Sequence, residues 1–301
     1  MKRTTNIFSI IIPSYNSINT IKYTIDSIQQ QNPELIHEVI IVDSSESNDV
    51  MDYITSLKNK KFKIIKSGIR VMPAIQRNIG AKKAKGKILL FIDSDVILLE
   101  GYLERIFKSY CEGKKTGGGA IVLPNFQRNI KIAIAQYYLQ LNEFLPYGKD
   151  RKKRCIPGCN IYCDNKTFFK AGCFPIIRAS EDTQFCYNVN KISEVWFIPK
   201  AKIAHIFRED TESFKNNQKM LGYYIGLNKN AKHIFIYRTS LLKLLIPIII
   251  TMKLMIISYR LFLAGCTHLN KTIKNSPLIF KGHYYWTLGF IEGYQSRISK
   301  D

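Results

Sequence analysis

The sequence predicts an α/β protein built on a mostly parallel sheet with helices on both faces. Short, unbroken apolar runs such as 8–12 and 88–92 are typical of strands buried on both faces. Between these runs apolar residues recur at helical spacing, as at Ile18, Ile21 and Ile25. Strands that alternate with helices indicate right-handed βαβ units, and therefore a parallel sheet.

The elements of the first hundred residues have clear boundaries. Asn32-Pro33 ends the first helix, the polar run 44–49 predicts a loop and a helix N-cap, and Gly86 ends the third helix. We expect strands at 8–12, 38–42, 62–65 and 88–92, and helices at 17–31, 50–58 and 73–84.

After residue 100 the alternation becomes less regular, so a second part of the chain is expected. We predict a catalytic domain at 1–215 and a helical C-terminal region at 216–301. The remaining predicted elements are helices at 101–111, 129–145 and 181–190, strands at 120–123, 195–198 and 201–205, and a loop over 151–160 that enters a strand.

Composition limits the classes of function. The formal charge of +22 favours anionic partners, namely nucleic acid, anionic lipid or phosphorylated ligands. Aromatic residues do not interleave with the basic ones as in an RNA-binding motif, which argues against nucleic acid. The seven cysteines lack paired zinc-ligand spacing and predict reduced cytosolic thiols. The apolar run before Pro13 is too short for a signal peptide, so we expect no export.

Two carboxylates follow the strand at 88–92. Asp93 and Asp95 flank Ser94 and point the same way if the strand geometry persists. Ligands of open α/β sheets bind at the carboxyl ends of strands, and two acids there can hold a divalent cation that grips a diphosphate. The alternative is a solvated turn after a core strand.

Seven motifs in chain order resemble family 2 glycosyltransferases with the GT-A fold, over roughly residues 7–210. The acidic loop departs from the family's usual pattern at Ser44, Ser45 and Asn48, and Gln184 stands where an acid is frequent. The motifs are 11–16, 42–49, 77–80, 93–95, 157–160 with 172–175, 181–183 and 199–205.

The resemblance implies a nucleotide-sugar donor and a divalent cation, Mg²⁺ or Mn²⁺. Asp95, with Asp93 nearby, would hold the cation, and His205 is either a further metal ligand or a structural residue. Asp43 would accept a hydrogen bond from a base imide, which favours uracil, or would cap its strand. The donor-binding residues implied are Pro13, Ser14, Tyr15, Asn16, Asp43, Ser45, Arg77, Asn78, Asp93 and Ser94.

On the acceptor side the resemblance implies that Asp182 is the catalytic base. Gly158, Asn160 and Glu181 would lie beside the acceptor. A single base and a single displacement predict inversion at the anomeric carbon. The alternative is that Glu181 and Asp182 only cap a helix.

The segment 241–265 is long enough to span a membrane, but Lys253 and Arg260 lie in its middle. At about 100° per residue they share one third of the helix circumference with Lys243. We therefore expect a helix lying in the membrane interface through a basic stripe, with 278–291 as a second interfacial element. The alternatives are a single span and a helical subdomain packed on the catalytic core.

The sequence thus predicts an inverting, metal-dependent glycosyltransferase at the cytoplasmic face of the cell membrane, either peripheral or with a single span. It would transfer sugar, preferably from a UDP-sugar, to a hydroxyl of a saccharide or lipid-linked glycan in cell-envelope synthesis. The alternatives are a polyprenyl-phosphate glycosyltransferase and a basic nucleic-acid-binding protein. The second leaves the paired acids unexplained, so we expect no nucleic-acid partner.

Overall fold

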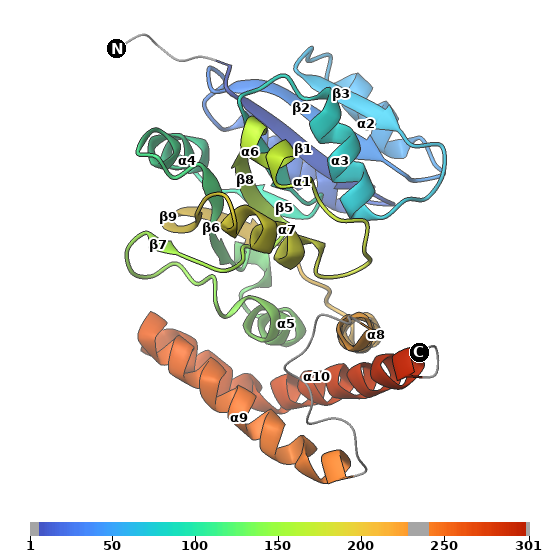
Figure 1. The fold of residues 1–301 in the computed structure, drawn as a ribbon, viewed down its shortest axis with the longest axis vertical. Coiled ribbons are helices and arrows are strands. Elements are labelled where there is room, and N and C mark those ends of the chain that lie inside the picture. Colours follow the sequence, from blue (N-terminus) through green and yellow to red (C-terminus); the bar gives the residue numbers. More distant parts are fainter. Residues whose placement is uncertain (1–5, 228–240, 299–301) are drawn as a thin grey trace. The chain divides into compact units, whose positions relative to one another are not determined.

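The computed structural model describes residues 6–227 and 241–298. The chain forms two compact units, shown with their elements in Figure 1. The first comprises Met1–Val122 and Pro146–Ile206, and the second Leu123–Leu145 and Phe207–Asp301. The predicted boundary at 215/216 falls inside a helix, and 123–145 join the C-terminal residues. The functional division of the chain at 215/216 stays a prediction.

One mixed sheet forms the first unit, with nine strands among the described residues. Its order is β3-β2-β1-β4-β8-β6-β9-β5, and β7 pairs with β9. The neighbours from β3 to β4 are parallel, as predicted, whereas β8 is antiparallel to β4 and to β6. The strands are β1 Phe8–Ser14, β2 Ile36–Asp43, β3 Phe62–Lys66, β4 Ile88–Ile92, β5 Val96–Leu98, β6 Thr116–Val122, β7 Arg151–Lys152, β8 Asn160–Asp164 and β9 Val195–His205.

Helices connect these strands on both sides of the sheet. The strand order reverses after β3, so right-handed crossovers place α1 and α2 on one face and α3 on the other. The helices of this unit are α1 Ile18–Gln29, α2 Asp49–Ser56, α3 Pro73–Lys83, α4 Tyr102–Cys111, α6 Asn165–Lys170 and α7 Glu181–Asn190. The predicted α/β architecture with a mostly parallel first half is confirmed.

The core of the sheet explains this order. Every residue of β1 and β4 is buried, as their unbroken apolar runs predict. Gly118 in β6 has no room for a side chain, because a Cβ there would collide with the Asn160 carbonyl oxygen. The chain therefore needs glycine where β6 passes β8.

The structure corrects the prediction of two separate strands at 195–198 and 201–205. They are one strand, β9, which continues through Pro199. The pairing of β6 with β9 shifts register between Gly119 and Ala120, which pair with Ile198 and Lys202. This shift accommodates the extra residues of β9 around Pro199. The short strands β5 and β7 are absent from the prediction because two or three residues carry no periodic signal.

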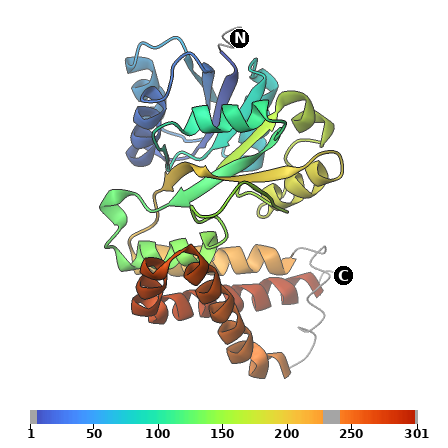
Figure 2. The ribbon, with the colours of Figure 1, turned by 90° about the vertical axis from the view of Figure 1, so that its left-hand side faces the viewer.

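The second unit is helical. It contains α5 Lys131–Leu141, α8 Thr211–Leu227, α9 Leu241–Ala264 and α10 Cys266–Ile298, after a short 3₁₀ turn at Asn125–Gln127. Figure 2 shows α8 and α10 side by side. Gly222 of α8 meets the Trp286 carbonyl and Gly289 of α10 meets the Lys219 carbonyl, each too close to admit a Cβ. Paired glycines thus let the two helix backbones touch.

Two residues of the predicted basic stripe on α9, Lys253 and Arg260, are half-buried and have partners within the second unit. The ammonium of Lys253 lies 3.6 Å from the centre of the Trp286 ring. Arg260 donates to Asn142 Oδ1 at 2.7 Å and pairs with Glu143 at 2.9 Å. The side chain of Lys243 lies outside the described residues. Within the described part of the chain, the helices fall short of the length and apolar character that a membrane crossing needs.

Candidate active site

A buried arginine joins the two halves of the candidate site. Arg77 of α3 donates from Nη2 to Asp93 Oδ1 at 2.7 Å and from Nη1 to Glu181 Oε1 at 2.9 Å. Burial disfavours the charged form of the guanidinium, but the two carboxylates favour it more strongly, so the pKa of Arg77 is raised. Asp93 follows β4 and Glu181 begins α7, so one side chain fixes the strand end against the helix start. The Arg77 side chain is itself buried, at 3% exposed.

Asp182 is held by the chain around it. Its Oδ2 accepts from the Gly158 backbone N–H at 2.9 Å, and its Oδ1 accepts from the Thr183 N–H at 2.6 Å. Gly158 also lies against the Arg77 guanidinium. A Cβ atom on Gly158 would be 3.2 Å from Arg77 Nη2. The structure therefore brings Asp182, Glu181 and Gly158 together around Arg77.

Glu181 differs from its neighbour in environment. Burial raises the pKa of its carboxyl, the Arg77 charge opposes this, and the Asp182 charge adds to the rise. The net direction is upward. Glu181 is thus committed to Arg77, whereas Asp182 keeps a partly exposed carboxylate that faces the loop at Gly158.

Asp95, the second of the two predicted acids, lies beside His205. The His205 Nε2 lies 3.6 Å from Asp95 Oδ1, because β5 pairs with β9 in a register that sets Val96 opposite His205. A carboxylate and an imidazole suit Mn²⁺ or Mg²⁺, which complete their shells with phosphate oxygens and water. Among the described residues no three His, Cys, Asp or Glu side chains form a full protein cage. The donor set therefore fits a cation shared with a diphosphate, while Asp93 is engaged by Arg77.

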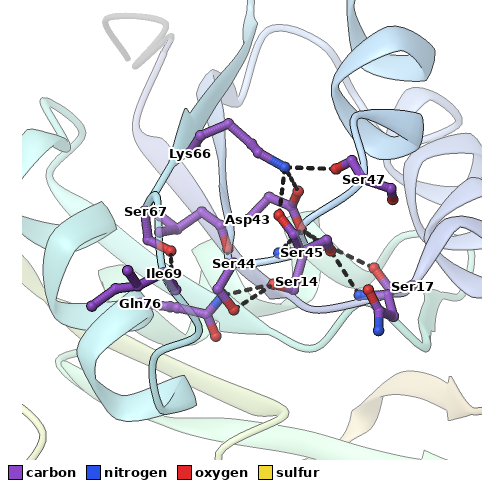
Figure 3. Close-up of polar contacts among 12 residues, drawn as sticks. Ser14, Ser17, Asp43, Ser44, Ser45, Ser47, Lys66, Ser67, Ile69 and Gln76 are labelled. Atoms are coloured by element: carbon purple, nitrogen blue, oxygen red, sulfur yellow. Dashed lines mark hydrogen bonds and ion pairs between the residues drawn. The ribbon is translucent and has the colours of Figure 1, made fainter.

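The predicted nucleotide loop folds into a network of serines around Asp43 (Figure 3). The Asp43 carboxylate is fully buried, and its Oδ1 accepts from Ser14 Oγ at 2.9 Å and Ser45 Oγ at 2.6 Å. Its Oδ2 accepts from Lys66 Nζ at 3.0 Å. Both oxygens thus already accept protein hydrogen bonds, as the strand-cap alternative requires. A base imide would reach Asp43 only after one of these partners moves.

Sequence reasoning missed Lys66 and Arg70. Lys66 ends β3 directly opposite Asp43 in the parallel register, so correct strand pairing would have found it. Arg70 lies with its guanidinium 4.3 Å from the centre of the Tyr15 ring, which is 38% exposed. Tyr15 was predicted and stands at the loop surface. The neighbouring Asn16 N–H donates to Ser45 Oγ at 2.7 Å.

Four further predicted residues are placed by the fold, and two of them, Asn160 and Asn78, have hydrogen-bond partners within it. The Asn160 amide donates to the Gly119 carbonyl at 2.7 Å and accepts from Tyr102, and its 0% exposure leaves no surface for an acceptor. The structure therefore places the Asn160 side chain inside the sheet and not on the acceptor side. Asn78 bonds both backbone groups of Phe174, and Pro13 is buried in β1. Ser94 is half-buried in the turn between the two acids.

Comparisons with known proteins point in the same direction. The family model described as Glycosyl transferase family 2 matches residues 9–180. The Escherichia coli glucosyltransferase WfaP is 39% identical over 87 residues, which are 29% of this chain and 34% of WfaP. A second E. coli glucosyltransferase, WfgD, is 24% identical over 213 residues, or 70% of this chain and 80% of WfgD. The aligned segments span 14%, 34% and 16% of three curated relatives, from Rickettsia bellii, E. coli and Staphylococcus aureus.

Solved structures share the fold at low sequence identity. The mannosyltransferase PcManGT from Pyrobaculum calidifontis, in complex with GDP-Man and Mn²⁺, has a TM-score of 0.58 and 15% identity. That match covers 100% of this chain and 92% of PcManGT. S. aureus TarS 1–349 with UDP-GlcNAc gives a TM-score of 0.55 at 16% identity, covering 98% and 92%. These matches confirm the predicted GT-A fold, and the family match over residues 9–180 shows that the chain belongs to glycosyl transferase family 2.

Proposed function

We propose that the protein transfers a sugar, with inversion, from a nucleotide-diphosphate donor to a hydroxyl of a saccharide or lipid-linked glycan. The observation that carries the proposal is the Arg77 bridge between Asp93 and Glu181. It ties Asp93, on the predicted donor side, to the start of the helix that carries Asp182. A donor and an acceptor need such a fixed geometry, because positioning supplies much of the rate enhancement of a displacement.

The donor side is assigned to the end of β4 and the loop before β5. A divalent cation held there by Asp95 and His205 would neutralise the charge that develops on the departing nucleoside diphosphate. Asp93, held by Arg77, lies beside this position and is suited to a donor hydroxyl. Tyr15 and Arg70 offer a flat, partly exposed surface on which a base can stack. UDP-sugars remain the favoured donors.

The acceptor side is assigned to Asp182. Two backbone N–H groups hold its carboxylate in a fixed orientation, and a general base needs such a fixed position. Asp182 takes the acceptor proton as the oxygen attacks the anomeric carbon from the side opposite the diphosphate. Glu181 is tied to Arg77 and serves to position α7. One base and one displacement give inversion.

The named activities of the relatives support one class of acceptor. WfaP and WfgD are named as glucosyltransferases acting on a GlcNAc-diphosphoundecaprenol, and TarS as a poly(ribitol-phosphate) transferase. We propose a cell-envelope glycan as acceptor, at the cytoplasmic face of the membrane. A polyprenyl phosphate is the alternative acceptor, and it would need no general base because a phosphate is already ionised. A nucleic-acid-binding role has no support in the site.

A donor screen tests this proposal. Purified protein is incubated with UDP- and GDP-sugars and a GlcNAc-diphospholipid acceptor, with Mn²⁺ or with a chelator, and nucleotide release is measured. We expect nucleotide release with one donor, and this release should depend on metal. NMR of the product should show that the anomeric configuration is inverted relative to the donor. Retention of configuration would overturn the single-displacement mechanism. Transfer to a polyprenyl phosphate alone would replace the proposed acceptor.

A further inference from the structure

The second unit presents an unusual helix surface. Seven large apolar side chains of α9 are each 47–65% exposed. They recur at helical spacing and so share one side of the helix. We call this side the outward face of α9. Its residues are Ile248, Met252, Met255, Ile256, Tyr259, Phe262 and Leu263.

The opposite side of α9 carries the charges. Ile257 and Leu261 are buried there, together with the half-buried Lys253 and Arg260. Burial lowers the pKa of Lys253 to about 8, and Arg260 is held by Asn142 and Glu143 of the same unit. A helix on a protein surface in water normally turns its charges outward. Here the charges turn inward and the apolar side chains turn out, which marks a binding surface.

Helix α10 adds a second set of exposed residues. Ile273, Phe280 and Tyr284 are 46–62% exposed at helical spacing. Exposed lysines, Lys271, Lys274 and Lys281, accompany them along the helix. Mixed aromatic, aliphatic and lysine side chains on one helix are typical of a helix at the boundary between lipid headgroups and acyl chains.

The charge of the segment selects the partner. The described exposed lysines of α10 are Lys271, Lys274 and Lys281. They would repel the same lysines of a second copy, so a homodimer through this face is disfavoured. An anionic lipid surface, in contrast, attracts basic residues that lie near it. Charge and apolar exposure thus point to the same occupant.

We infer that the outward face of α9 is the surface by which the protein sits on an anionic lipid bilayer. Its apolar side chains enter the headgroup region, while the lysines of α10 lie near lipid phosphates. This places the contact on the side of α9 opposite to the basic stripe predicted from sequence. The inference rests on the membrane location proposed above, but not on the transfer reaction.

Vesicle co-sedimentation of the full chain tests the inference. The probes are vesicles of phosphatidylglycerol with phosphatidylcholine, and vesicles of phosphatidylcholine alone. The variant is Met255→Gln with Tyr259→Ser, since both side chains are 65% exposed and contribute little to the core. We expect its partition coefficient on anionic vesicles to fall at least tenfold with an unchanged melting temperature. Ile192→Gln, an exposed isoleucine of the first unit, is the matched control and should bind as wild type.

A second variant separates the charge contribution. Lys271→Gln with Lys274→Gln and Lys281→Gln should weaken binding to anionic vesicles and leave binding to neutral vesicles unchanged. Equal vesicle binding by wild type and the Met255/Tyr259 variant would overturn the inference. So would light scattering that shows a dimer which the same variant dissociates. Nucleotide release with a soluble acceptor is measured in parallel, so a protein that binds vesicles but transfers no sugar contradicts only the proposed function.

Discussion

At the scale of single residues, Arg77 determines how the candidate site is arranged. Its guanidinium is buried and has two carboxylate partners on elements far apart in sequence, at Asp93 and Glu181. A planar guanidinium can serve two acids in fixed directions, whereas a lysine ammonium cannot reproduce this geometry. The sequence motif placed Arg77 near the donor, but only the fold reveals that it spans to the acceptor side.

Asp182 provides the sharpest test at this scale. Asp182→Asn cannot take up a proton, so we expect turnover to fall by about two to four orders of magnitude. It loses one of two hydrogen bonds from backbone N–H groups, which costs about 1 kcal/mol of stability. Turnover and melting temperature are measured together. Glu181→Gln is the matched control and should lose less activity. Activity lost only in proportion to folded protein would favour the helix-capping role.

Asp95 tests the metal assignment independently of catalysis. Asp95→Asn keeps the shape of the side chain and removes the carboxylate charge that would pair with a cation. In the structure Asp95 Oδ1 lies 3.6 Å from the His205 imidazole. We expect calorimetry to show weaker binding of UDP with Mn²⁺, and little change in binding of UDP without metal. Asp52→Asn, at an exposed position of α2 outside the predicted nucleotide loop, is the control. Unchanged metal-dependent binding would remove Asp95 from the metal site.

At the scale of elements, the sequence predicted the parallel half of the sheet well, because β1, β2 and β4 are long, apolar and bounded by clear turns. It failed for β9, where Pro199 reads as a strand end, and for β5, which directly follows Asp95. It also failed for the orientation of α9, since both sides of this helix are apolar. The side that turns inward is decided by Trp286, Asn142 and Glu143, which no local pattern connects to Lys253 or Arg260.

Helix α10 carries a pH-dependent element. Burial, together with the nearby Lys253 charge, lowers the pKa of His283 from its ordinary 6.5 to about 4. The unfolded chain therefore takes up this proton first as the pH falls. The stability that neutral His283 contributes is present above about pH 6.5 and is lost as the pH falls toward 4, a loss on the order of a few kcal/mol.

His283→Leu removes the titration at similar size. No hydrogen-bond partner of the His283 Nε2 is found among the described residues, so the substitution should cost little stability at pH 7.5. We expect the melting temperature of the variant to fall less than that of wild type between pH 6.5 and pH 4. Differential scanning calorimetry across this range measures it. Parallel curves for the two proteins would show that another group causes the acid loss.

At the scale of the whole molecule, family membership and fold were within reach of the sequence, because the seven motifs follow one another along the chain in the order that the family shows. The fine structure of the site was not. Asp43 was predicted to face a base, but Lys66 and two serines enclose it. Asn160 was predicted at the acceptor side, but Tyr102 and Gly119 hold it in the core. Both outcomes depend on side chains brought together by tertiary packing.

If the protein both transfers sugar and sits on lipid through α9, the two properties should combine at a bilayer. A surface-bound enzyme meets a lipid-linked acceptor at high effective concentration. We therefore expect Met255→Gln with Tyr259→Ser to lower kcat/KM at least tenfold for a lipid-linked acceptor in anionic vesicles. The same variant should keep wild-type kcat/KM for a short soluble acceptor, because both residues lie outside the catalytic unit. An equal loss of kcat/KM with both acceptors would mean that the substitutions disturb the active site itself. No loss with either acceptor would mean that membrane contact through α9 does not contribute to catalysis.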